Sequence, residues 1–79
     1  MNNFYLFTFN DDSTFTASCE TPFKEVIYNL AVYCGFDYPL FCKSLNGFED
    51  DDKEGLIGLA NHWSHKSIEH VYIVDKQIF

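Results

Sequence analysis

The first twenty residues carry the pattern of two β-strands joined by a turn. Asn3 to Phe9 and Thr14 to Cys19 are rich in aromatic and β-branched residues, which favour strands. Residues 10–13, which separate them, are Asn, Asp, Asp and Ser, the types that form tight turns. The pattern therefore predicts an antiparallel hairpin at the start of the chain.

Two registers of this hairpin place different side chains on its apolar face. A two-residue turn groups Phe4, Leu6, Phe15, Ala17 and Cys19. A three-residue turn with a bulge, built on a type I turn that starts at Asn10, groups Tyr5, Phe7, Phe9, Phe15, Ala17 and Cys19. We favour the second register because it gathers more apolar surface on one side, although it places Ser13 in a left-handed conformation that glycine suits better.

A helix is predicted from Thr21 to Cys34. Thr21 offers an N-cap hydroxyl, and Pro22 suits the first helical position, where its missing N–H removes no hydrogen bond. Apolar residues then recur at helical spacing, at positions 23, 26, 27, 30, 31 and 34. Gly35 follows as the C-terminal cap.

Two shorter helices are predicted downstream. The first runs from about Pro39 to Leu45, started by Asp37 and stopped by Asn46 and Gly47. The second runs from Gly55 to Ser64, where two glycines lower the helix propensity. Its apolar face would be formed by Leu56, Leu59, Ala60 and Trp63.

The last predicted element is a strand from His70 to Val74, which Gln77 to Phe79 would extend. These elements predict an α+β fold, in which the N-terminal hairpin and the C-terminal strand form a three-stranded antiparallel sheet with two to three helices packed on one face. The 79 residues are expected to form one compact domain.

The charge of the chain bears on its partners. Twelve Asp and Glu residues stand against five Lys and no Arg, a formal net charge of −7. Phosphate backbones are bound through Lys and Arg, so direct binding of nucleic acid is not expected. A field of this sign attracts proteins with basic surfaces, and we predict a basic protein or ribonucleoprotein as the partner.

Other compositional features argue against a secreted protein, a membrane-spanning protein and an enzyme. Cys19, Cys34 and Cys42 form an odd set without a CxxC pair, and no leader peptide precedes them, so reduced thiols in the cytoplasm of a bacterial host cell are expected. No apolar run approaches the ~18 residues of a membrane span. Because no nucleotide-binding or nucleophile motif is present, we predict that the protein is not an enzyme and has no cofactor and no metal site.

An acidic run from Glu49 to Glu54 is the most distinctive local feature. We predict that it contacts the partner together with the acidic turn of the hairpin, and that exposed tyrosines of the first helix add anchoring contacts. Reversal of the central charges of the run is expected to weaken binding while the fold survives. The predicted contact residues are Glu49, Asp50, Asp51, Asp52, Glu54, Asp11, Asp12, Tyr28 and Tyr33.

The same run has a second interpretation as a calcium loop. Asp50, Asp52, Glu54 and Gly55 match the ligand and turn positions of an EF-hand loop. Asn61 occupies the position where that loop requires a bidentate Glu. A calcium-responsive module therefore stands as an alternative, with a simple solvated loop as a third interpretation.

Taken as a whole, the chain resembles the small, acidic, single-domain inhibitors encoded by bacteriophages, including anti-CRISPR proteins and DNA mimics. The resemblance is one of class and rests on size, acidic balance without Arg, the aromatic hairpin and the Glu49 to Glu54 run. It implies steric and electrostatic block of a basic nucleic-acid groove in a bacterial defence complex. Alternatives are an immunity or antitoxin protein that plugs a basic nuclease, and a module that self-assembles through its aromatic sheet face, so the protein is expected to be a monomer or a homodimer.

Overall fold

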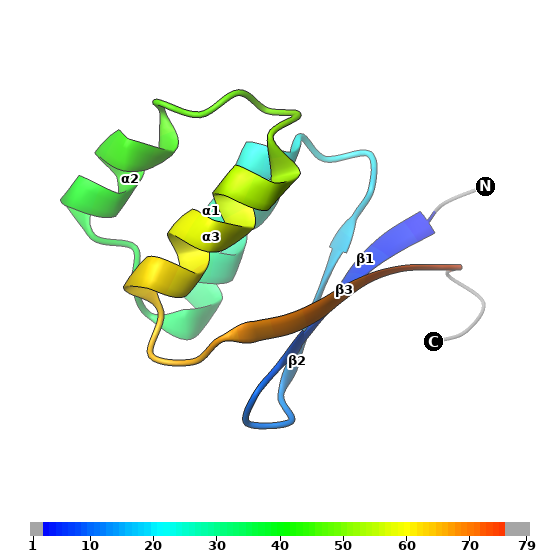
Figure 1. The fold of residues 1–79 in the computed structure, drawn as a ribbon. Coiled ribbons are helices and arrows are strands. Elements are labelled where there is room, and N and C mark those ends of the chain that lie inside the picture. The colour runs from blue at the N-terminus through cyan, green and yellow to red at the C-terminus, as the bar shows by residue number, and fades with distance from the viewer. Residues whose placement is uncertain (1–2, 76–79) are drawn as a thin grey trace.

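A three-stranded antiparallel sheet has three helices on one side in the computed structural model, which describes residues 3–75, and two of them separate the third from the sheet (Figure 1). The elements are β1 (Asn3–Phe9), β2 (Thr14–Ser18), α1 (Phe23–Cys34), α2 (Pro39–Leu45), α3 (Lys53–Trp63) and β3 (Ile68–Asp75). The strand order is β2-β1-β3, so the first strand of the chain lies at the centre. This confirms the predicted α+β fold. The proposed extension of the last strand over 77–79 lies outside the described residues.

The hairpin has the favoured register. Tyr5 pairs with Ala17 and Phe7 pairs with Phe15, so these side chains share the face that the helices cover. The turn itself differs from the prediction. Its tight hydrogen bond joins the Asp12 N–H to the Phe9 carbonyl, 3.1 Å away, so the turn begins one residue before Asn10.

The left-handed residue of the turn is Asp12, at φ 68°, and not Ser13. A short polar side chain such as Asp visits this conformation more readily than most non-glycine residues. The one-residue difference does not change which side chains face the helices, because the loop still contains three residues, 10–12, between Phe9 and Ser13.

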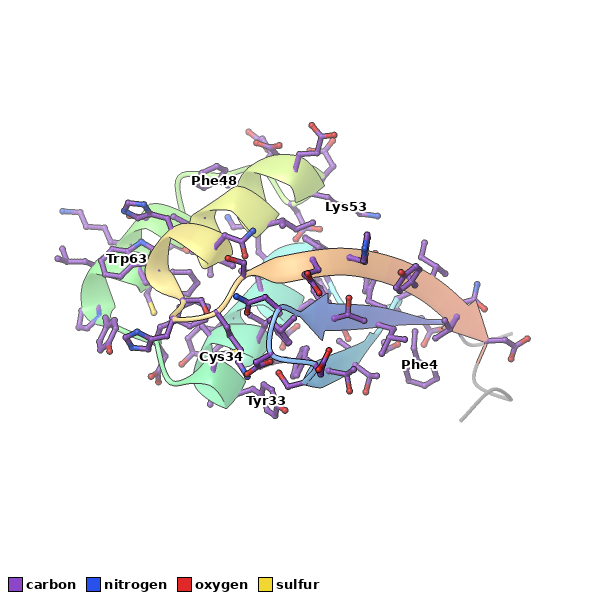
Figure 2. All side chains as sticks on the ribbon, turned by 60° about the horizontal axis from the view of Figure 1, so that its bottom comes forward. Phe4, Tyr33, Cys34, Phe48, Lys53 and Trp63 are labelled. Carbon is purple, nitrogen blue, oxygen red and sulfur yellow. The ribbon has the colours of Figure 1, made fainter. Side chains whose placement is uncertain are left out.

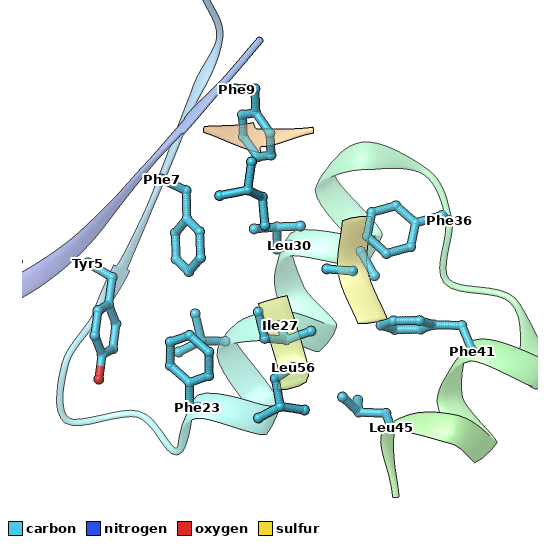
Figure 3. Packing of buried hydrophobic residues seen from close by; sticks show 14 residues of the cluster. Tyr5, Phe7, Phe9, Phe23, Ile27, Leu30, Phe36, Phe41, Leu45 and Leu56 are labelled. Carbon is cyan, nitrogen blue, oxygen red and sulfur yellow. The ribbon is translucent and has the colours of Figure 1, made fainter. Parts of the chain in front are cut away.

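The core lies between the sheet and helices α1 and α3, and continues between these helices and α2 (Figure 3). Aromatic rings dominate it: the Tyr5 and Phe23 rings meet edge to face at 5.2 Å, and the Phe36 and Phe41 rings do so at 5.1 Å. No polar side chain is buried among the described residues. The buried hydrophobic residues are Tyr5, Phe7, Phe9, Phe23, Val26, Ile27, Leu30, Ala31, Phe36, Phe41, Leu45, Leu56, Ala60 and Ile68.

Helix α1 ends as predicted but begins differently. Gly35 adopts φ 84° and caps the helix through its N–H to the Ala31 carbonyl at 2.8 Å. At the other end, Pro22 occupies the N-cap position and no side chain of the local sequence caps the helix. The predicted N-cap role of Thr21 is therefore wrong, because Thr21 lies one residue too early.

The remaining elements differ from prediction mainly at their ends. Tyr38 occupies the N-cap position of α2, with no side-chain hydrogen bond, so Asp37 does not start that helix. Helix α3 begins at Lys53, two residues before the predicted Gly55, because Asp52 caps it. Strand β3 begins at Ile68 because its pairing with β1 continues to Phe9 through a register shift.

Candidate functional site

Seven exposed carboxylates gather where α1 and α3 begin. The β2–α1 and α2–α3 connections both lie at the top of Figure 1, and a hydrogen bond from the Lys24 N–H to the Asp50 carboxylate, at 3.0 Å, ties them together. We call this surface the acidic end. Its members are Glu20, Glu25, Glu49, Asp50, Asp51, Asp52 and Glu54.

Two carboxylates of the acidic end cap helices. Asp50 accepts from the Lys24 N–H in the first turn of α1, 26 residues away in sequence, and so supplies the cap that the local sequence lacks. Asp52 accepts from the Gly55 N–H of α3 at 3.1 Å. A Cβ at Gly55 would press on the Asp52 carboxylate, so glycine leaves the room that this cap requires. Both caps place negative charge at the positive ends of helix dipoles.

This capping divides the acidic run into two parts. Asp50 and Asp52 are exposed, as expected. Because both also cap helices, reversal of their charges is expected to lower the stability of the fold in addition to weakening binding. Glu49 and Asp51 form no side-chain hydrogen bond or ion pair with another described residue. Glu49 and Asp51 are therefore exposed carboxylates that cap no helix.

The lysines compensate little of this charge. The Lys53 ammonium lies 5.3 Å from the centre of the Tyr5 ring and 5.7 Å from that of Phe23, and Figure 2 shows its side chain at the start of α3. Such cation–π contacts hold the ammonium against the rings. Lys24 is the other lysine at the acidic end and is half-buried. Seven carboxylates therefore face two lysines, one of them stacked on rings.

The structure separates Asp11 and Asp12 from the acidic end. The hairpin turn that holds them lies at the bottom of Figure 1, at the opposite end of the molecule. There Asp11 accepts hydrogen bonds from the Ser13 N–H and hydroxyl and forms an ion pair with Lys66 at 3.3 Å. The Lys66 ammonium also lies 4.9 Å from the centre of the Phe9 ring. The predicted contact residues thus do not form one surface.

The Asp11 contacts lower the pKa of its carboxyl to about 2, chiefly through the Ser13 side-chain and backbone hydrogen bonds. Because the pKa of Asp11 in the folded state is below its ordinary value of 3.8, the ionised carboxylate stabilises the fold at pH values above 3.8. This contribution is lost as the pH falls through about 2. We therefore expect an NMR titration to give a pKa of about 2 for the Asp11 carboxyl.

The Ser13→Ala variant should raise that pKa toward its ordinary value, and should do so more than Lys66→Met, because the serine makes the largest contribution. An equal effect of the two variants, or an unperturbed Asp11 in the natural sequence, would contradict the assignment.

The two predicted tyrosines lie in different surroundings. Tyr28 is 40% exposed and lines a shallow groove of about 370 Å³ between α1 and α2. The lining residues are Lys24, Glu25, Tyr28, Cys42, Leu45 and Asn46. The Tyr33 ring instead lies 5.2 Å from that of Phe15 and 5.7 Å from the Lys66 ammonium. Tyr28 therefore adjoins the acidic end and Tyr33 does not.

The groove was not foreseen from the sequence. Its far wall consists of Cys42, Leu45 and Asn46 from α2, and their approach to α1 depends on how the two helices pack. The spacing of apolar residues within either helix does not indicate that these two helix faces lie close together.

Neither metal ligands nor reactive thiols form a chemical centre in the described part of the chain. Residues 3–75 contain no group of three His, Cys, Asp or Glu side chains that could hold a metal ion, and the carboxylates of the calcium interpretation, Asp50 and Asp52, bond to different helices. The three cysteines are half-buried and unpaired. Burial raises the pKa of the Cys19 and Cys34 thiols, which lowers their reactivity.

Within residues 3–75, no helix covers the outer face of the sheet. Phe4, Leu6, Tyr72 and Val74 lie on it in paired positions, with Tyr72 47% exposed. Self-assembly through this face stays a prediction.

The lengths of the helices bear on whether one of them could span a membrane. The longest helix, α1, has 12 residues, and no helix within residues 3–75 is long and apolar enough to cross a membrane. Comparison of the chain with protein-family models, with curated proteins and with solved structures found no match.

Proposed function

We propose that this protein is a non-enzymatic inhibitor that binds a basic nucleic-acid groove of a bacterial defence complex, as anti-CRISPR proteins and DNA mimics do. The observation that carries the proposal is the acidic end, where seven exposed carboxylates from two helix starts and their connections face two lysines. A groove built for phosphates presents Lys and Arg, and a concentrated negative surface of this kind competes for them.

The acidic end is held in place, which favours binding over a loosely solvated loop. Asp50 ties the α2–α3 connection to α1 and Asp52 ties it to α3. The neighbouring Glu49 and Asp51 are thereby presented from a restrained backbone. A pre-organised charge array loses less conformational entropy on binding than a mobile one.

Tyr28 supplies the apolar contact that charge alone lacks. Its ring lines the groove beside Lys24 and Glu25, and exposed tyrosines of this kind are common anchors of protein interfaces. We assign Tyr28 to the contact surface and leave Tyr33, Asp11 and Asp12 out of it, because they lie toward the hairpin turn.

A pull-down tests the proposal. Tagged protein is mixed with lysate from bacteria that express candidate effectors, eluted with a salt gradient, and the bound proteins are identified by mass spectrometry. We expect a basic nucleic-acid-binding protein that added DNA or RNA displaces. Recovery of a single basic nuclease would favour the immunity-protein alternative, and recovery of the protein alone would overturn the proposal.

Charge reversal then locates the surface. Asp51→Lys is expected to weaken binding of the recovered partner by about fivefold at low salt and to lower its salt sensitivity. Asp37→Lys is the matched control, since it changes the net charge equally at an exposed position in the connection that follows α1, at the opposite end of this helix from the acidic end. Equal losses in the two variants would mean that overall charge, and not the acidic end, governs binding.

A further inference from the structure

Strand β3 is an exposed sheet edge. Among the described residues it pairs only with β1, and it is eight residues long, whereas the other edge strand, β2, has five. Tyr72 and Ile73, in its middle, are 47% and 63% exposed. Long edge strands offer unpaired backbone groups to another strand.

The pairing pattern identifies which backbone groups face outward. The Phe9 N–H bonds to the Ser13 carbonyl and the Asn3 carbonyl accepts from Cys19, so odd-numbered residues of β1 bond to β2. Because backbone groups alternate along a strand, even-numbered residues of β1 bond to β3. Their partners there are His70, Tyr72 and Val74. The N–H and carbonyl groups of Val71 and Ile73 therefore point away from the sheet.

Charges lie only at the two ends of this edge. Glu69 is exposed at the register shift near the start of β3, and Asp75 ends the strand. The five residues between them, 70–74, include no Lys, Arg, Asp, Glu or Pro, which are the types that commonly protect edges. Within residues 3–75, the middle of the edge therefore carries none of these protections against strand addition.

These end charges disfavour a second copy as the added strand. If both copies used the outward groups of Val71 and Ile73 in antiparallel pairing, Val71 of one copy would lie opposite Ile73 of the other. The same register sets Glu69 opposite Asp75 at both ends, and like charges in opposed positions destabilise a sheet. A strand with Lys or Arg at those positions would be attracted instead.

We propose that β3 accepts an extended segment of the basic partner as an antiparallel added strand. The segment carries Lys or Arg at two positions six residues apart, opposite Glu69 and Asp75, and apolar β-branched or aromatic residues opposite Val71 and Ile73. The basic character of the partner rests on the proposed function, whereas the place and geometry of the contact rest on β3 itself. Main-chain hydrogen bonds supply affinity and the end charges supply selectivity.

A synthetic peptide tests the site directly. The blocked peptide Lys-Thr-Val-Thr-Val-Thr-Lys sets valines opposite Val71 and Ile73, and a Glu-ended version is its matched control. Titrated into 15N-labelled protein, the Lys-ended peptide should shift the amide signals of Val71 and Ile73 and slow their hydrogen exchange. The Glu-ended peptide should bind about tenfold more weakly.

Proline variants separate the two sheet edges. Ile73→Pro removes an outward N–H while leaving the β1 ladder intact, a change that edge strands tolerate, and it should abolish peptide binding. Thr16→Pro makes the same change on the β2 edge, where the even-numbered residues point outward, and should leave binding unchanged. Should Ile73→Pro fail to fold, Glu69→Lys on the surface serves instead and should reduce the preference for the Lys-ended peptide.

Several results would overturn the proposal. They are no peptide binding up to about 1 mM, shifts confined to the acidic end, or equal binding by Ile73→Pro. A dimer in sedimentation that Ile73→Pro dissolves would make a second copy the occupant. Failure of the proposed function is distinguishable, because Asp51→Lys tests the acidic end with the recovered partner and does not alter the backbone groups of β3.

Discussion

Replacing Leu30 by Ala should lower the free energy of unfolding by about 2–5 kcal/mol. Leu30 lies on the buried face of α1 and is completely buried in the core, so its truncation loses apolar burial and leaves a cavity. A domain of this length has about 4–12 kcal/mol of stability in total. Urea denaturation followed by circular dichroism measures the loss.

Leu40→Ala is the matched control for this prediction. It is the same chemical change, but Leu40 lies on α2 with 66% of its surface exposed. Its effect on the free energy of unfolding should stay within about 0.5 kcal/mol. Comparable losses in the two variants would mean that the core is not arranged around α1 as described.

Removal of the two carboxylate caps should have the next largest effect on stability. Asp50→Ala and Asp52→Ala should each lower the free energy of unfolding by about 1 kcal/mol, because each leaves a helix N–H without its side-chain acceptor. Asp50→Asn and Asp52→Asn keep an acceptor oxygen and should lose less. Thermal and urea unfolding of the four variants provide the measurement.

Asp51→Ala lies between the two caps and serves as their control. Asp51 is exposed and accepts no hydrogen bond from a described residue, so its removal should change the free energy of unfolding by less than about 0.5 kcal/mol. If all three alanine variants behaved alike, relief of charge repulsion in the run, and not helix capping, would control stability.

Most of the fold could be predicted from local sequence patterns. The alternation of Tyr5, Phe7 and Phe9 predicted the buried face of β1, and Gly35 predicted the end of α1, because both depend on interactions between neighbours in sequence. The start of α1 was not predicted correctly, because it depends on an interaction between residues that are distant in sequence. Its cap comes from Asp50, far away in sequence, and no local pattern near Thr21 indicates such a partner.

The candidate site was predictable in composition but not in arrangement. The Glu49 to Glu54 run was evident in the sequence, but its grouping with Glu20 and Glu25 arises only when α1 and α3 begin at the same end of the fold. The same tertiary arrangement sends Asp11 to the other end, where Lys66 pairs with it. Charge counts along a chain do not report which charges share a surface.

The central place of β1 has a consequence for the order of folding. The β1–β2 hairpin closes a loop of three residues, whereas β1 meets β3 only after Phe9 and Ile68 come together across the whole helical segment. Closing the longer loop costs more chain entropy and is the slower event. We therefore expect the hairpin to pair early and β3 to dock last. Until then β1 has one open side, and this intermediate is the species most exposed to misassociation during refolding.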